Sequence, residues 1–90
     1  GVVGLTRHGA LRWAKAGIRV NAVCPGVIET PMTAPIAANP EVRKIMDAMT
    51  PMGRMGQAEE IAGAVLWLCS DQASFVTGHP LVVDGGATAT

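Results

Sequence analysis

The segment GIRVNAVCPGVIETPM, residues 17–32, is the part of the sequence that says most about the fold. Its first part, residues 18–24, is short, apolar and rich in β-branched residues, which predicts a buried strand. Pro25 and Gly26 then end the strand, because proline fixes one backbone angle and glycine permits a tight turn. In open parallel sheets, ligands bind beyond the carboxyl ends of the strands, so this exit is a candidate binding site.

The residues that follow the turn have groups suited to a flat polar ligand. Ile28 can offer its backbone N–H and C=O to a group such as a carboxamide, and Thr30 adds a hydroxyl. Pro31 biases Thr30 towards an extended backbone. A Pro-Gly pair after a strand is also a common way for a chain to turn, so this spacing alone leaves an ordinary turn as the alternative.

A helix is predicted on the N-terminal side of the strand, over residues 2–15. Its polar side chains, His8 among them, form one narrow stripe, and apolar residues cover about half of the circumference. That width predicts two buried faces, one that packs on a sheet and one that packs on a partner. Gly9 in the middle predicts the close approach of another element. Gly17 suits the left-handed residue that ends a helix.

A second long helix and a second strand are predicted on the C-terminal side. The helix covers residues 58–70, begins with two carboxylates and has no charge from residue 61 to residue 69. Its apolar side chains point all around, which predicts burial on nearly every side. Residues 81–83 predict the strand. Strand, helical crossover and strand are typical of a parallel pair, so the order predicts an α/β fold.

The segment of residues 33–56 contains three prolines and predicts an irregular excursion between the two strands. Asn39 followed by Pro40 predicts a short helix over residues 40–49. All five methionines lie in or beside this excursion: Met32, Met46, Met49, Met52 and Met55. Two interpretations stay open, namely packing that fills gaps and an adaptable apolar lid over a substrate.

Composition limits the class of protein. The 90 residues allow one domain, and 49% hydrophobic against 16% charged residues excludes a disordered segment. Seven basic residues balance seven acidic ones, so we expect no surface for nucleic acid or for an anionic membrane. No apolar run is long enough to span a bilayer, and no signal-peptide pattern begins the chain. Cys24 and Cys69 are expected to be reduced, buried thiols of a cytoplasmic protein.

Several short motifs, in order and over almost the full length, resemble the C-terminal part of the short-chain dehydrogenase/reductase family. The motifs are GLTR at 4–7, GIRVNAVCPG at 17–26, IETPM at 28–32, PMGRMGQAEEIAGAVLWLCSD at 51–71, ASFVTGH at 73–79 and VDGG at 83–86. The resemblance implies the C-terminal portion of a Rossmann-like, doubly wound parallel sheet. Residues 1–90 are then part of a single domain, with residues 33–56 as a substrate lid.

The same resemblance implies NAD or NADP as cofactor and a small alcohol or carbonyl substrate. Carried over to this sequence, Pro25 and Gly26 line the nicotinamide pocket. Ile28 holds the carboxamide through its backbone, and Thr30 forms a hydrogen bond to the cofactor. The implied assembly is a homo-oligomer, a tetramer in the intact family member. The implied lid residues are Met32, Met46 and Met49.

The catalytic groups of the family are expected outside these residues. Its Tyr-x-x-x-Lys motif would end just before Gly1, its catalytic serine would lie further upstream, and the chain contains no tyrosine. Without that phenol as general acid, we expect no turnover from this chain alone. Asn21 and Asp84 match family positions that we expect to be structural.

Three interpretations of the function stay open. The leading one is a fragment of an NAD(P)-dependent oxidoreductase that supplies a nicotinamide wall, a substrate lid and an oligomer interface. The second is a non-catalytic module that docks through its apolar helices onto a family member or onto copies of itself. The third is a piece of a longer sequence, which a start inside a helix favours. The wide apolar faces also predict that the isolated chain is poorly folded or self-associating.

Overall fold

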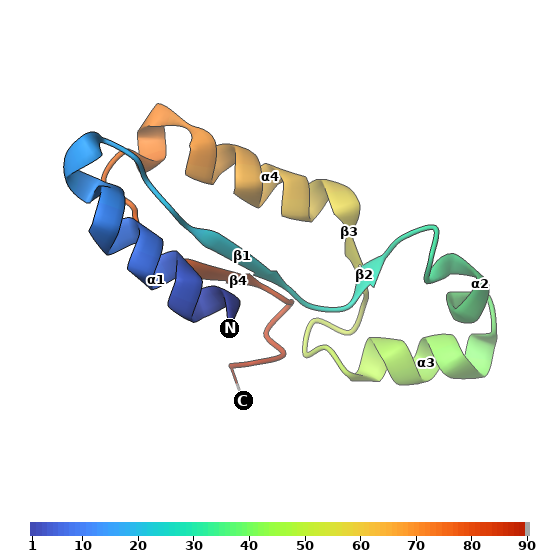
Figure 1. Cartoon of the computed structure of the whole chain (residues 1–90). Coiled ribbons are helices and arrows are strands. Elements are labelled where there is room, and N and C mark those ends of the chain that lie inside the picture. The colour runs from blue at the N-terminus through green and yellow to red at the C-terminus, as the bar shows by residue number, and fades with distance from the viewer. Residues whose placement is uncertain (90) are drawn as a thin grey trace.

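Two helices lie on opposite sides of a two-stranded parallel sheet in the computed structural model, which describes residues 1–89 (Figure 1). The sheet consists of β1 (Ala22–Pro25) and β4 (Pro80–Val83). Helix α4 (Ala58–Cys69) contacts both strands, and helix α1 (Val2–Trp13) contacts β1. The α/β class, the parallel pair and the helix within the crossover between its strands are therefore confirmed.

Strand β1 begins at Ala22 rather than at residue 18, because its partner β4 starts opposite Ala22. Upstream of that point, Asn21 holds the chain with its side chain. Its amide donates to the Val76 C=O at 3.0 Å, and its carbonyl accepts from the His79 N–H at 3.0 Å. The Asn21 side chain thus adds to the backbone hydrogen bonds on either side of it, from the Gly78 N–H to the Val20 C=O at 2.7 Å and from the Ala22 N–H to the His79 C=O at 3.0 Å, in agreement with its expected structural role.

Helix α1 continues into the short 3-10 helix η1 (Ala14–Ala16) and ends at Gly17, whose φ of 78° is left-handed as predicted. Gly9 is buried, and a Cβ there would lie 3.4 Å from the Val20 side chain, so the predicted close approach is confirmed. Of the two predicted buried faces of α1, the face towards the sheet is covered, and the face expected to pack on a partner stays a prediction. The exposed apolar residues of α1 include Val2, Leu5 and Leu11.

Helix α4 begins at the predicted residue, where the Glu60 carboxylate accepts from the Gln57 N–H at 3.0 Å. Leu68 is buried, whereas Val65, Leu66 and Trp67 are exposed. The prediction that this helix is buried on nearly every side is therefore wrong for the chain. Within residues 1–89, the sheet covers one side of α4, and its other contacts are mainly with the short elements that directly precede and follow it, residues 56–57 and 71–73.

The two cysteines are free and lie nearer to the surface than predicted. Cys69 on α4 is exposed, and Cys24 on β1 is half-buried. A hollow of about 410 Å³ lies between α4 and β1, and Val23, Leu68 and Cys69 are among the residues that line it. The expectation of two buried thiols is wrong, because within these residues the sheet has no strand on the outer side of β1.

The excursion forms an arm, residues 30–55, that projects from one end of the sheet (Figure 1). It contains α2 (Ala34–Ala37), which was not predicted, and α3 (Pro40–Ala48), which was. Asn39 caps α3 as expected, because its side-chain oxygen accepts from the Glu41 N–H at 3.0 Å.

Two very short strands join the arm to the rest of the molecule. They are β2 (Ile28–Glu29) and β3 (Gly56–Gln57), which pair in parallel and were missed by the sequence analysis. The arm makes the molecule long, 51 × 23 × 20 Å. Its radius of gyration is 15.7 Å, against about 12 Å for a compact domain of this length. No helix within residues 1–89 is long and apolar enough to cross a membrane.

Candidate functional site

The strand exit at Pro25 and Gly26 packs against the chain that leaves β4. Pro25 lies opposite Val83, and the Gly26 N–H donates to the Val83 C=O at 3.0 Å. A Cβ on Gly26 would lie 2.8 Å from the Asp84 Cα and 2.7 Å from the Asp84 Cβ, closer than real side chains come. The sequence predicted a tight turn at a candidate binding site, and on this side of Gly26 the space is filled by Asp84.

Asp84 organises the turn after β4. Its carboxylate accepts from the Gly86 N–H at 3.0 Å, from the Thr88 N–H at 3.0 Å and from the Thr88 hydroxyl at 2.8 Å. These hydrogen bonds, the one from the Thr88 hydroxyl above all, lower the pKa of Asp84. The carboxylate is thus occupied within its own turn, as expected of a structural residue.

The backbone of Ile28 faces away from its partner strand. Ile28 lies opposite Gly56, whose N–H donates to the Val27 C=O at 2.8 Å. In a parallel ladder each residue directs both backbone groups to one side, so the N–H and C=O of Ile28 point away from β3. On that side the Thr33 hydroxyl can donate its one proton either to the Ile28 C=O at 3.3 Å or to the Thr30 C=O at 3.1 Å. One donor and one acceptor are thus presented together, as a carboxamide ligand requires.

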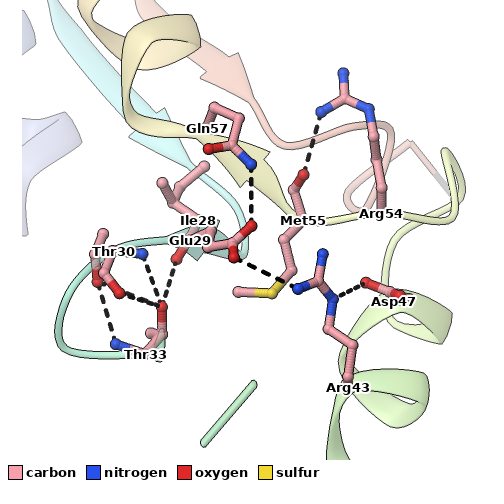
Figure 2. A network of polar contacts seen from close by, with 9 residues as sticks. All are labelled: Ile28, Glu29, Thr30, Thr33, Arg43, Asp47, Arg54, Met55 and Gln57. Carbon is pink, nitrogen blue, oxygen red and sulfur yellow. Dashed lines mark hydrogen bonds and ion pairs between the residues drawn. The ribbon is translucent and has the colours of Figure 1, made fainter. Parts of the chain in front are cut away.

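Thr30 and Thr33 hold each other across the turn that follows β2 (Figure 2). The Thr30 N–H donates to the Thr33 hydroxyl oxygen at 2.8 Å, and the Thr33 N–H donates to the Thr30 hydroxyl oxygen at 3.3 Å. Thr33 was not among the predicted site residues. The signal for it was the Thr-Pro-Met-Thr spacing, which is typical of a hydroxyl that closes a turn onto the backbone.

The methionines separate into two groups. Met55, at the root of the arm, is 1% exposed and fills space in the core, which fits the packing interpretation for that residue. Met32, in the turn before α2, is 86% exposed, and Met49, at the end of α3, is also exposed. Met46 within α3 is half-buried. The predicted lid residues therefore lie on the arm, and their contact with a substrate stays a prediction.

A cavity of about 240 Å³ lies beside the strand exit. Ile28 from β2, Ile61 from α4 and Val83 from β4 line it. Pro25, Gly26 and Thr30 do not line it, so the structure does not gather the four predicted cofactor residues around this one cavity. Among the described residues, the buried hydroxyl oxygen of Thr50 is the one buried side-chain oxygen or nitrogen without a hydrogen-bond partner.

An ion pair fixes the root of the arm to the start of α4. Arg54 Nη1 lies 2.8 Å from Glu60 Oε1, and Arg54 Nη2 lies 3.1 Å from Glu60 Oε2. The hydrogen bonds from Arg54 and from the Gln57 N–H lower the pKa of Glu60 from 4.5 to about 2, and the same pair raises the pKa of Arg54. Glu60 therefore stays ionised at neutral pH.

A second polar cluster lies where β2, β3 and α3 meet (Figure 2). Gln57 Nε2 donates to Glu29 Oε2 at 3.0 Å, and Arg43 Nη1 lies 3.5 Å from Glu29 Oε1. Arg43 Nε also donates to Asp47 Oδ1 at 3.1 Å, one helical turn along α3. None of these contacts was predicted, and Glu29 lies far in sequence from both Gln57 and Arg43. Within residues 1–89, no cluster of side chains suits a metal ion.

The sequence of this chain is similar to the sequences of several known proteins. The family model described as enoyl-(acyl carrier protein) reductase matches residues 1–88. The 3beta-hydroxysteroid dehydrogenase 1 of Eggerthella lenta is 51% identical over 88 residues, which cover 98% of this chain and 34% of that protein. The short-chain dehydrogenase anuF of Penicillium roqueforti is 50% identical over 88 residues, which cover 97% of this chain and 32% of that protein. The chain thus spans about a third of the length of these relatives.

Solved structures give the same result for the fold. A 4-hydroxyisoleucine dehydrogenase complexed with NADH matches with a TM-score of 0.92 and 36% identity, over 98% of this chain and 36% of that chain. ElxO with NADP bound matches with a TM-score of 0.92 and 32% identity, over 99% of this chain and 36% of that chain. The parallel strands and flanking helices are therefore part of a Rossmann-like domain. The chain belongs to the short-chain dehydrogenase/reductase family and corresponds to the C-terminal part of its members.

Proposed function

We propose that this chain supplies one wall of the nicotinamide site in an NAD(P)-dependent oxidoreductase. The reaction is reversible transfer of a hydride between the nicotinamide ring and a small alcohol or carbonyl substrate. The observation that carries the proposal is the backbone of Ile28, which presents its N–H and C=O on one side, next to Thr30. The dehydrogenase relatives, and the NADH and NADP bound in similar solved structures, support it.

The groups at the strand exit fit a nicotinamide carboxamide. The Ile28 N–H can donate to the carboxamide oxygen, and the Ile28 C=O keeps a second lone pair for the amide because Thr33 uses at most one. The Thr30 hydroxyl accepts from Thr33 and has a proton to donate to the cofactor. Pro25 and Gly26 would border the ring. The bound cofactor would supply the hydride, and these residues would orient it.

We assign no catalytic acid or base to this chain. Reduction of a carbonyl needs a proton donor at its oxygen as the hydride arrives, and the chain contains no tyrosine. Its two histidines are exposed, and the backbone N–H of His79 donates to the side-chain oxygen of Asn21. The proposal therefore places the acid in the rest of a family domain and expects no turnover from the 90 residues alone.

The remaining surfaces have proposed roles as well. The arm would act as the substrate lid, through Met32, Met46 and Met49, and the exposed faces of α1 and α4 would contact the rest of the domain and further copies in a homo-oligomer, a tetramer in the intact enzyme. Two free cysteines support a cytoplasmic protein. Charges that sum to zero support a surface that binds neither nucleic acid nor a membrane.

The second candidate function is a non-catalytic interaction module. The observation in its favour is the exposure of large apolar side chains on both helices, such as Leu11 on α1 and Leu66 on α4. Such faces bind partners whether or not a cofactor is present. Cofactor binding is therefore the property that separates the two functions.

The test uses a chimera in which residues 1–88 replace the matching residues of the Eggerthella lenta dehydrogenase, so that the family's other groups are present. We expect Thr30→Val to weaken NADH or NADPH binding by about 2- to 10-fold, the value of one hydrogen bond. Binding is measured by titration of the nicotinamide fluorescence. The 90-residue chain alone is the control for turnover and should show none with either cofactor.

Thr6→Val is the matched control, because it makes the same substitution at a buried hydroxyl of α1 that donates to the Val2 C=O within its own helix. It should leave cofactor affinity unchanged. A Thr30→Val chimera that binds the cofactor as tightly as the unmodified chimera contradicts the role of Thr30. A chimera that folds but binds neither cofactor contradicts the proposed function and favours the interaction module.

A further inference from the structure

The arm has a narrow attachment to the rest of the molecule. It leaves through β2 and returns through β3, and these two-residue strands are the one strand pair at its base. Its helices α2 and α3 contact each other, and neither packs extensively on α1, on α4 or on the β1–β4 sheet. So short a base specifies the direction of the arm weakly, and side-chain contacts must add to it.

Glu29 is the residue at which these side-chain contacts meet. One carboxylate oxygen accepts from Gln57 Nε2 on β3 at 3.0 Å, and the other lies 3.5 Å from Arg43 Nη1 on α3 (Figure 2). Glu29 and Gln57 are 28 residues apart in the sequence. One carboxylate therefore joins the strand that leaves the sheet, the strand that returns to it and the longer helix of the arm.

The orientation of Arg43 is itself supported. Its Nε donates to Asp47 Oδ1 at 3.1 Å within α3, so the guanidinium is held from both sides by carboxylates. The side chains of Arg43, Glu29 and Asp47 are 35%, 33% and 31% exposed, and partly exposed ion pairs add little to global stability. What such a pair can do is choose one direction for an arm whose base is short.

Glu29 also lies between the two residues proposed to hold the cofactor. Neighbouring side chains on a strand point to opposite faces, and Ile28 lines the cavity while Glu29 faces Arg43 (Figure 2). A shift of the arm is therefore transmitted to the segment that carries the Ile28 backbone and Thr30. The same short segment serves the cofactor on one side and the arm on the other.

We propose that Glu29 is a positioning residue, which sets the direction of the arm relative to the strand exit through Arg43 and Gln57 and so sets the affinity for the substrate. This inference rests on the proposed function for its effect on substrate. Its structural part, the coupling of α3 to β2, stands on the contacts alone. Glu29 touches neither the cofactor nor the reacting atoms in this assignment, and it acts through the arm.

The first measurement is hydrogen exchange on the 90-residue chain and on the chimera. In Glu29→Gln, which keeps an acceptor for Gln57 and removes the charge opposite Arg43, the α3 amides should exchange about two- to fivefold faster. The α4 amides should not change. Glu59→Gln is the matched control, since it makes the same substitution at an exposed carboxylate in the first turn of α4, outside the arm, and should leave the α3 amides unchanged.

The second measurement is the kinetics of the chimera. Glu29→Gln and Arg43→Gln should each raise KM for the substrate about two- to fivefold, with kcat and the cofactor dissociation constant unchanged. The double variant should be no worse than either single variant, because both remove the same pair. If Glu29 had a purely structural role, its substitution would raise KM and would also lower kcat and the affinity for the cofactor.

The outcomes are separable. Unchanged α3 exchange in Glu29→Gln overturns the inference, whatever the activity. Faster α3 exchange with an unchanged KM overturns the positioning role and leaves a structural contact. If the unmodified chimera folds but binds no cofactor, the proposed function has failed, and the exchange rates of α3 still decide whether Glu29 couples the arm to β2.

Discussion

Gly26 lies where the carboxyl ends of strands β1 and β4 pack against each other. The main chain of Asp84 occupies the position that a side chain on residue 26 would need, at 2.8 Å from the Asp84 Cα. Asp84 cannot easily move, because its carboxylate is bound to Gly86 and Thr88. The sequence predicted a glycine turn at this point, and the structure gives a different physical reason for it, namely the close approach of another strand end.

Gly26→Ala should therefore destabilise the fold by about 1–3 kcal/mol, the usual cost of forcing an extra methyl group into a packed site. The measurement is the urea midpoint of the 90-residue chain at one fixed protein concentration. Gly63→Ala is the matched control, because Gly63 lies within α4 and has no neighbour within 4 Å. That control should stabilise by about 0.5–1 kcal/mol through helix propensity. An unchanged midpoint in Gly26→Ala contradicts the steric argument.

The start of α4 depends on one ion pair and one backbone hydrogen bond. Glu60 binds the Arg54 guanidinium with both oxygens and accepts from the Gln57 N–H. These bonds lower its pKa from 4.5 to about 2 in the folded chain. A carboxyl whose folded pKa is lowered stabilises the fold above its unfolded pKa, and that contribution is lost as the pH falls towards the folded pKa.

The first turn of α4 should therefore lose stability as the pH falls from 4.5 towards 2. Glu60→Gln should lower stability at neutral pH and flatten the acid response in this range. Glu59→Gln, one position away in the same turn, keeps the ion pair and should keep the response. Hydrogen exchange of the α4 amides against pH measures the effect. An acid response in Glu60→Gln as steep as in the unmodified chain would falsify the assignment to Glu60.

At the scale of elements, local patterns predicted the helices well. Asn39 and Pro40 begin α3, and Gly17 ends the first helical segment in a left-handed conformation, as expected from side-chain capping and glycine geometry. The pair β2–β3 was missed because two residues carry no periodic pattern. Pairing of so short a strand depends on what lies opposite it, and that residue is far away in the chain.

At the scale of the whole molecule, the accessible surface is too large for a self-sufficient domain. The chain exposes 6348 Å², whereas a folded monomer of 9.3 kDa is expected to expose about 5,000 Å². Leu11 is 84% exposed and Phe75 is 102% exposed. Both the arm and the uncovered helix faces contribute, so apolar surface is left for a partner.

We expect the isolated chain to self-associate as its concentration rises. Light scattering after size exclusion should give a mass above that of one chain, and Leu11→Glu should shift the equilibrium towards the monomer by adding a charge to the uncovered face of α1. Gln72→Glu, an exposed position in the 3-10 helix η2 (Asp71–Ala73), adds the same charge away from that face and should not. A monomer with a sharp, cooperative melt at all concentrations contradicts this expectation.

By itself, the amino-acid sequence determined the two long helices, the approximate position of both strands, the parallel α/β order and the family, because these depend on patterns within short stretches. Only the tertiary structure decided that Asp84 lies against Gly26, that Ile28 turns its backbone away from β3 and that Glu29 meets Arg43 and Gln57. It also decided that the apolar helix faces stay exposed. Contacts between distant residues depend on how elements pack, and packing has no signature in any one stretch of the chain.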